Sequence, residues 1–306
     1  MKAKKMKRLI LFVSIIGLFM VCGTAIAEMG QKAIAEIRLS IEKSAFSKET
    51  KASLLKKASD AVNAGIQPDD IAVIINRGLN RGVDSKTIEG FIDTAIKVKG
   101  QNLPARPVMD RIQQGLSKGV PPERILGVTK RLAEKLTEAD TITKNLVDSG
   151  VKAGDSKERE DAVQAVARAL ERSIPEDIIA QIGVTVKKHN YSLSMFSRAI
   201  HTMTTFVESG MPVNEASRLV NKAMNKGYSE KDMLTMEKEA ANEIKEGKRM
   251  EDIGRRMESV MERGSFGQGF RGMEGGRGPG TGSGMGGGSG MGSDSGWGSG
   301  SGMERR

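Results

Sequence analysis

The chain has 306 residues with a single cysteine, and its formal net charge at pH 7 is +10. One cysteine excludes a disulfide-stapled scaffold and a metal site built from several thiolates. The charge would favour a polyanionic partner, but the first 27 residues carry five basic and no acidic side chains. Without them, 48 less five leaves 43 basic residues against 38 acidic ones, so charge gives little support for a nucleic-acid partner.

Residues 1–27 have the organisation of an export signal. Five Lys and Arg residues precede an apolar stretch from Leu9 to Cys22, and Ala25-Ile26-Ala27 supplies the small residues of a signal-peptidase site. The stretch is shorter than the about 20 apolar residues that a transmembrane helix needs. We therefore predict a cleaved signal, export to the periplasm or the extracellular space, and no stable transmembrane anchor. An uncleaved anchor is the alternative.

Residues 28–263 repeat apolar stripes with the helical period of 3.6 residues, without competing strand alternation. Three of these stripes are Ile71, Ile74, Ile75 and Leu79; Val108, Met109, Ile112 and Leu116; and Met233, Met236, Ala240 and Ile244. Between stripes, a Gly is followed by Pro, Ser or Asp, which joins a left-handed helix stop to a helix start. The sequence predicts an all-α domain of about a dozen short helices with an aliphatic core.

The spacing of these Gly marks predicts how the helices are arranged. Gly65, Gly82, Gly100 and Gly119 are 17, 18 and 19 residues apart, and Gly210 and Gly227 are again 17 apart. Short loops favour antiparallel neighbours, so we expect hairpins of about 35 residues stacked as an α-solenoid-like array. The period is similar to that of tetratricopeptide repeats, but the Trp, Gly and Tyr positions of that pattern are missing. An irregular helical domain with ordinary short loops is the alternative.

Two segments interrupt the helical pattern. Residues 149–156 contain two Gly and the cap signal Asp155-Ser156, which predicts either a boundary between two lobes or one longer loop. Residues 264–306 hold 19 of the 37 Gly residues of the chain and repeat Gly-Ser-Gly-Met. That composition predicts a disordered tail, either without a specific partner or adhesive through its few aromatic and methionine side chains.

Residues suited to catalysis are few. His189, expected at a helix C-terminus, and His201, expected within an amphipathic helix, lie outside any metal or triad motif. Glu208-Ser209 resembles the start of the Glu-Ser motif of lytic transglycosylases, but the Gly-Leu-Met-Gln motif of that family is absent, and a helix end explains the pair. The sequence therefore predicts no catalytic, cofactor-binding or metal-ligating residue.

Methionine and lysine clusters suggest two other activities. Nine methionines lie in the last third of the helical region: Met195, Met203, Met211, Met224, Met233, Met236, Met250, Met257 and Met261. Thioethers can bind Cu(I), but these positions coincide with apolar stripes, which favours core packing. Basic pairs such as Lys187-Lys188 lack interleaved aromatic residues, so the sequence disfavours nucleic-acid binding.

We expect an exported, non-enzymatic binding or scaffold protein that presents a surface or groove between its helices to a protein or peptide of the cell envelope. Two alternatives from other classes are copper handling through the C-terminal methionines and a cell-wall hydrolase with an unrecognised carboxylate.

The export prediction has a defined chemical outcome. Cleavage after Ala27 leaves Glu28 as the first residue of the mature chain. Mass spectrometry of the intact exported protein should give the mass of residues 28–306, and a mass that includes Met1 or the apolar stretch would contradict cleavage.

Overall fold

The structure is a computed structural model that describes residues 32–263. The predicted signal, residues 1–27, and the predicted tail, residues 264–306, lie outside the described residues. The described part is all-α, as predicted, with residues 32–43 helical and eleven further helices after them. These are α2 (Lys48–Asn63), α3 (Pro68–Asn80), α4 (Ser85–Gly100), α5 (Arg106–Ser117), α6 (Pro122–Asp148), α7 (Ser156–Glu171), α8 (Glu176–Lys188), α9 (Leu193–Glu208), α10 (Val213–Asn225), α11 (Glu230–Lys245) and α12 (Met250–Glu262).

Side-chain caps begin five of the helices. The residues at the N-caps of α2, α4, α7, α9 and α11 each accept a hydrogen bond from a backbone N–H in the first turn, and they are Ser47, Asp84, Asp155, Ser192 and Ser229. Each bond satisfies a donor that the helix itself leaves free. Four of the shorter helices, α3, α5, α8 and α10, instead have a proline in the first turn or at the N-cap, where its missing N–H costs nothing.

Left-handed residues end most of the helices. The five Gly marks at positions 65, 82, 119, 210 and 227 all have positive φ, as the sequence predicts. The expectation for Gly100 is wrong, because Gly100 is the last residue of α4 and the left-handed residue is Asn102, with φ 59°. Ser173 and Asn190 have the same role, each with φ 57°. Asn enters this region more readily than most residues, so a search for Gly alone misplaces such turns.

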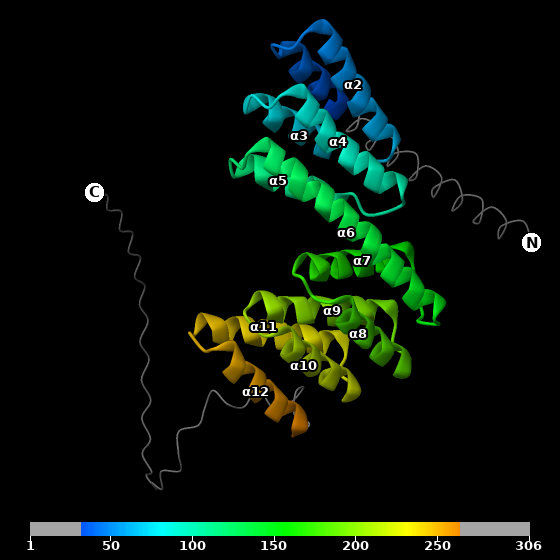
Figure 1. Cartoon of the computed structure of the whole chain (residues 1–306), viewed down its shortest axis with the longest axis vertical. Helices are drawn as coiled ribbons and strands as arrows, with labels where there is room; N and C mark the ends of the chain where they lie inside the picture. Colours follow the sequence, from blue (N-terminus) through cyan, green and yellow to red (C-terminus); the bar gives the residue numbers. More distant parts are fainter. Residues whose placement is uncertain (1–31, 264–306) are drawn as a thin grey trace, which may run out of the picture.

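Helix lengths and turns recur along the chain. Helices of 16 residues alternate with helices of 12 or 13 on both sides of α6. The left-handed residues Ser173, Gly210 and Gly247 follow one another at intervals of 37 residues. On each side of α6 the 16-residue helices pack on one another, α2 on α4, α7 on α9 and α9 on α11, and so do the shorter helices, α3 on α5, α8 on α10 and α10 on α12. Figure 1 shows the helices stacked along the long axis of the molecule.

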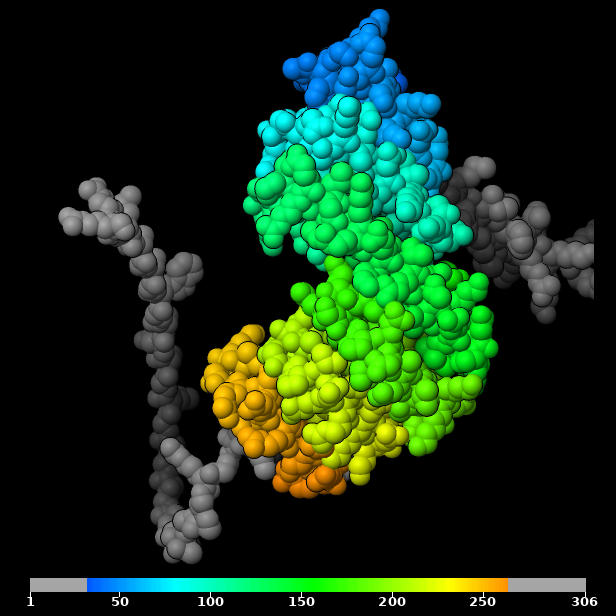
Figure 2. All heavy atoms as spheres, in the orientation of Figure 1, coloured from blue at the N-terminus to red at the C-terminus, as the bar shows by residue number. Residues whose placement is uncertain are grey.

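The alternation is interrupted at α6, which runs for 27 residues without a break. No Gly or Pro occurs between Val128 and Ser149 to end it. Thr137 and Thr141 donate their hydroxyl protons to carbonyls four residues earlier, at 3.1 and 3.2 Å, which accommodates their side chains within the helix. As a result α6 connects the part formed by α2 to α5 with the part formed by α7 to α12, and the surface is hollowed beside it (Figures 1 and 2).

The segment after α6 is held by the elements around it. Val151 is buried, and the carbonyl of Lys152 accepts a hydrogen bond of 2.8 Å from the N–H of Leu193 at the start of α9. Buried apolar residues form one cluster from Ile37 to Met261. Residues 149–156 are otherwise exposed, and Val151 joins the segment to a core that continues on both sides of it in the described part of the chain.

The nine methionines of the last third are core residues, with exposed fractions of 8% or less. One predicted core position, Ile244, is wrong: it is 36% exposed. Glu243 takes the buried position instead, because it forms an ion pair with Arg256 of α12. None of the helices in residues 32–263 combines the length and the apolar character that crossing a bilayer requires.

A pair of glycine substitutions tests the role of the turns. We expect Gly82→Ala to lower the free energy of unfolding by about 1–2 kcal/mol, because Gly82 has φ 66° and an L-residue is strained there. Gly127→Ala, inside α6 with open space around its Cα, should raise it by about 0.5–1 kcal/mol. Urea unfolding of the mature chain, followed by circular dichroism, gives both values. Equal effects from the two substitutions would contradict the left-handed conformation of Gly82.

Candidate functional site

The strongest candidate site is a cleft beside α6, which we call the central cleft. It has a volume of about 780 Å³, within the range of known ligand sites. Its walls are Pro107, Asp110, Arg111 and Gln114 of α5; Glu158, Asp161, Gln164, Ala165, Ala167, Arg168, Glu171 and its neighbour Arg172 of α7; Ser194, Ser197, Arg198, His201 and Glu208 of α9; and Glu230 of α11, with Leu132 and Leu136 of α6 completing the lining. α6 packs on both α5 and α7, and the surface beside it is hollowed (Figure 2).

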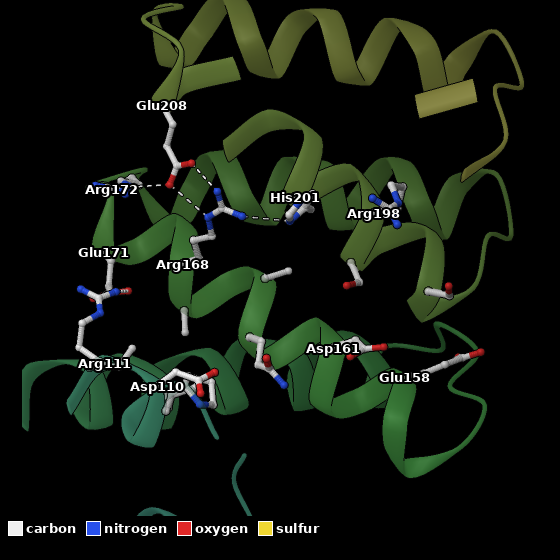
Figure 3. A pocket seen from close by; sticks show the side chains of 18 of the residues that line it. Asp110, Arg111, Glu158, Asp161, Arg168, Glu171, Arg172, Arg198, His201 and Glu208 are labelled. Carbon is white, nitrogen blue, oxygen red and sulfur yellow. Dashed lines mark hydrogen bonds and ion pairs between the residues drawn. The ribbon is translucent and has the colours of Figure 1, made fainter. Parts of the chain in front are cut away.

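One end of the cleft holds three arginines, Arg111, Arg168 and Arg172, and we call it the arginine end (Figure 3). Glu208 accepts hydrogen bonds from Arg168 Nε at 3.1 Å and from Arg172 Nε at 2.7 Å, and it also pairs with Arg168 Nη2. Glu171 of α7 binds Arg111 of α5 at 3.1 Å across the cleft. Three guanidinium groups against these two carboxylates leave a local excess of one positive charge.

His201 joins this network from α9. Its Nδ1 lies 3.4 Å from Arg168 Nη1, and its Nε2 lies 3.7 Å from a carboxylate oxygen of Glu237. Burial lowers the pKa of His201, and the Arg168 charge acts in the same direction, while Glu237 opposes them. The imidazole is therefore neutral at pH 7, and Arg168 can donate to its Nδ1 only in the tautomer that carries the proton on Nε2.

Glu208, which the sequence singles out, is bound as an anion. The hydrogen bond from Arg168 lowers the pKa of Glu208 most, and Arg172 adds to the effect. A glycosidase general acid needs the opposite, a carboxyl with a raised pKa that still holds its proton. Glu208 is therefore a partner of two arginines, and its lowered pKa does not suit the general-acid role.

The other end of the cleft holds Glu158 and Asp161, and we call it the acidic end (Figure 3). Glu158 accepts a hydrogen bond of 2.9 Å from the N–H of Gly154. Asp161 is exposed and has no ion-pair partner among the described residues. Arg198 reaches this end from α9, but it pairs with Glu237 at 3.8 Å. The two ends of the central cleft therefore carry opposite charge.

The remaining candidates from the sequence lie apart from the cleft. His189 is at the C-cap of α8, as predicted, and its Nε2 lies 2.8 Å from Asn225 Oδ1. The methionines considered for copper are buried in the core. No group of three or more His, Cys, Asp or Glu side chains within residues 32–263 is arranged to hold a metal ion.

A second hollow of about 500 Å³ lies between the C-terminal half of α6 and α8. It has an apolar lining that includes Ile142, Leu146 and Val184, and Val184 is 68% exposed. It lacks the converging, ion-paired groups of the central cleft, so the central cleft is the better candidate.

Sequence reasoning did not find the cleft arginines. They are spaced as ordinary solvent-facing helical residues, and only the packing of α7, α9 and α5 brings them together. Polar contacts across these packed helices often join residues 36 apart, such as Arg172 with Glu208 and His189 with Asn225. An analysis of charge pairs at that separation could have found part of the network.

No protein family matches the chain, and no curated protein matches its sequence.

The most perturbed carboxyl in the described chain lies outside the cleft, on α11. Burial raises the pKa of Glu239 to about 7, although the nearby Arg256 of α12 opposes the shift. Within residues 32–263, the buried Oε2 atom of Glu239 has no hydrogen-bond partner. Its ionised form is therefore disfavoured where α11 meets α12.

This shift predicts a pH-dependent stability. The folded pKa of about 7 exceeds the ordinary value of 4.5, so the contribution of Glu239 is complete below pH 4.5 and is lost as the pH rises through 7. We expect Glu239→Gln to be as stable as the wild type near pH 4.5 and more stable at pH 8. Urea unfolding across this range checks it. A difference between the two proteins that stays constant with pH would contradict the shift.

Proposed function

We propose that the chain is an exported, non-enzymatic helical binding or scaffold protein, and that the central cleft receives a protein or peptide partner in the cell envelope. The observation that carries the proposal is the cleft itself, a cavity of about 780 Å³ walled by charged side chains from four helices. Protein sites that bind ligands are usually concave and few in number.

The proposal includes a repeat architecture, an α-solenoid-like array of antiparallel helical hairpins. The alternating helix lengths and the turns 37 residues apart support it. So do hydrogen bonds between residues 36 apart in successive units, as from Thr185 to Asn221. Arrays of this kind provide extended concave surfaces for partners, and the interruption at α6 deepens that surface into a cleft.

The charges of the cleft favour binding over catalysis. Three of the six carboxylates in its lining pair with arginines: Asp110 with Arg106, Glu171 with Arg111, and Glu208 with both Arg168 and Arg172. The hydrogen bond from Arg168 lowers the pKa of Glu208 and favours its ionised form, whereas acid–base catalysis needs a group that exchanges its proton near the working pH. The buried methionines favour packing over copper handling.

A substitution that fills the cleft tests this function. Ser197 lines the cleft on α9 and is half-buried, so Ser197→Trp should occupy part of it. Ser259→Trp, on the exposed face of α12, is the matched control. We expect affinity capture from a cell-envelope extract to recover the same protein partner with the wild-type mature chain and with Ser259→Trp, and to lose it with Ser197→Trp.

The same capture is repeated with a mature chain that lacks residues 264–306. Recovery of the partner without the tail supports binding through the helical domain. Loss of the partner only when the tail is removed, with no effect of Ser197→Trp, would contradict binding in the central cleft.

A further inference from the structure

The two ends of the central cleft differ in which hydrogen-bonding groups they leave free. At the arginine end, Arg172 uses its Nε–H for Glu208, and Arg111 uses an Nη2–H for Glu171. A guanidinium group has five N–H donors. Most donors of these two side chains have no acceptor in the described part of the chain.

The arginine side chains of this network are more exposed than the carboxylates that they bind. The side chain of Arg172 is 57% exposed, whereas that of its partner Glu208 is 20% exposed. Arg111 and Glu171 differ in the same way. The carboxylates are thus more buried than the arginines that they hold in place, and both arginines line the cleft. Positioned guanidinium groups with free N–H donors are suited to binding a carboxylate through two parallel hydrogen bonds.

The other carboxylates of the lining do not neutralise the charge of these two arginines. Asp110 pairs with Arg106 on its own helix at 3.5 Å, and Glu230 lies in the first turn of α11, where the helix dipole favours its charge. At the acidic end, the exposed carboxylate of Asp161 is available to a cation, and Glu158 lies on the same helix one turn earlier.

From this polarity, and resting on the proposed function, we infer that the central cleft binds an extended peptide segment of mixed charge. An acidic side chain of the peptide lies against Arg111 and Arg172, and a basic side chain lies against Asp161 and Glu158. Charge complementarity at both ends fixes the direction in which the segment lies and rejects segments with the charges in other positions.

The test uses two blocked peptides of equal composition, acetylated at the N-terminus and amidated at the C-terminus. The segregated peptide is Glu-Glu-Gly-Gly-Gly-Gly-Lys-Lys, and the mixed peptide is Glu-Lys-Gly-Gly-Gly-Gly-Lys-Glu. Binding to the isotope-labelled mature protein is followed by NMR titration at low salt. We expect the segregated peptide to bind about tenfold more tightly and to shift the signals of cleft residues. Equal affinities, or no binding of the segregated peptide, would overturn the inference.

Substitutions test whether the arginine end of the cleft binds the peptide. Arg111→Gln with Arg172→Gln should weaken binding of the segregated peptide about tenfold. Arg218→Gln should leave it unchanged, because Arg218 is 59% exposed and pairs with Glu258 in the same manner, but lies outside the cleft. A loss as large in Arg218→Gln as in the cleft variant would show that net charge alone controls binding.

A variant that gains binding distinguishes the charge preference of the cleft from the effects of misfolding. A third blocked peptide, Glu-Glu-Gly-Gly-Gly-Gly-Glu-Glu, should bind Asp161→Lys more tightly than it binds the wild type. Glu160→Lys changes the net charge equally at an exposed position outside the cleft lining and should have a smaller effect. Equal effects would overturn the inference. The capture experiment with Ser197→Trp has its own outcome, so a cleft that binds a partner without this charge preference would refute the inference and leave the proposed function standing.

Discussion

The uninterrupted course of α6 is the constraint on which the central cleft depends. In α2 to α5 and in α7 to α11, a left-handed residue ends the helix after 12 to 16 residues. Between Val128 and Ser149 no Gly or Pro provides such a stop, and the helix continues to Asp148. The surface beside α6 is hollowed (Figure 2), and the hollow is lined by charged side chains of α5, α7 and α9.

The polar network of the cleft follows from that separation. Where helices pack closely, apolar side chains such as Phe91 and Phe206 fill the space between them. Across the cleft, the ion pair between Arg111 and Glu171 bridges the gap between α5 and α7. On the α7 and α9 side, Glu208 is held by two arginines and His201 by Arg168 and Glu237. Isolated surface ion pairs contribute little stability, so the value of this network lies in fixing the positions of its donors.

The C-terminal end of the described chain is held differently from the cleft. Near the C-terminus, α12 packs on α10 and α11, and Arg256 brings a guanidinium group to the buried carboxylate of Glu243 and the disfavoured carboxylate of Glu239. Burying two carboxylates near one cation is costly unless one of them takes up a proton. This contact thus favours the protonated form of Glu239 where α12 packs on α11.

The sequence by itself determined the helices, because apolar period, N-cap residues and glycine stops act over a few neighbouring residues. It located the turns at Gly65, Gly82, Gly119, Gly210 and Gly227, and it failed at Asn102, where a residue other than Gly takes the left-handed conformation. It also failed at Ile244, because the ion pair that buries Glu243 comes from another helix. Only the tertiary structure decided that Arg111 and Arg172, 61 positions apart in the chain, lie at one end of a single cleft, since helix packing and not local sequence sets which exposed faces meet.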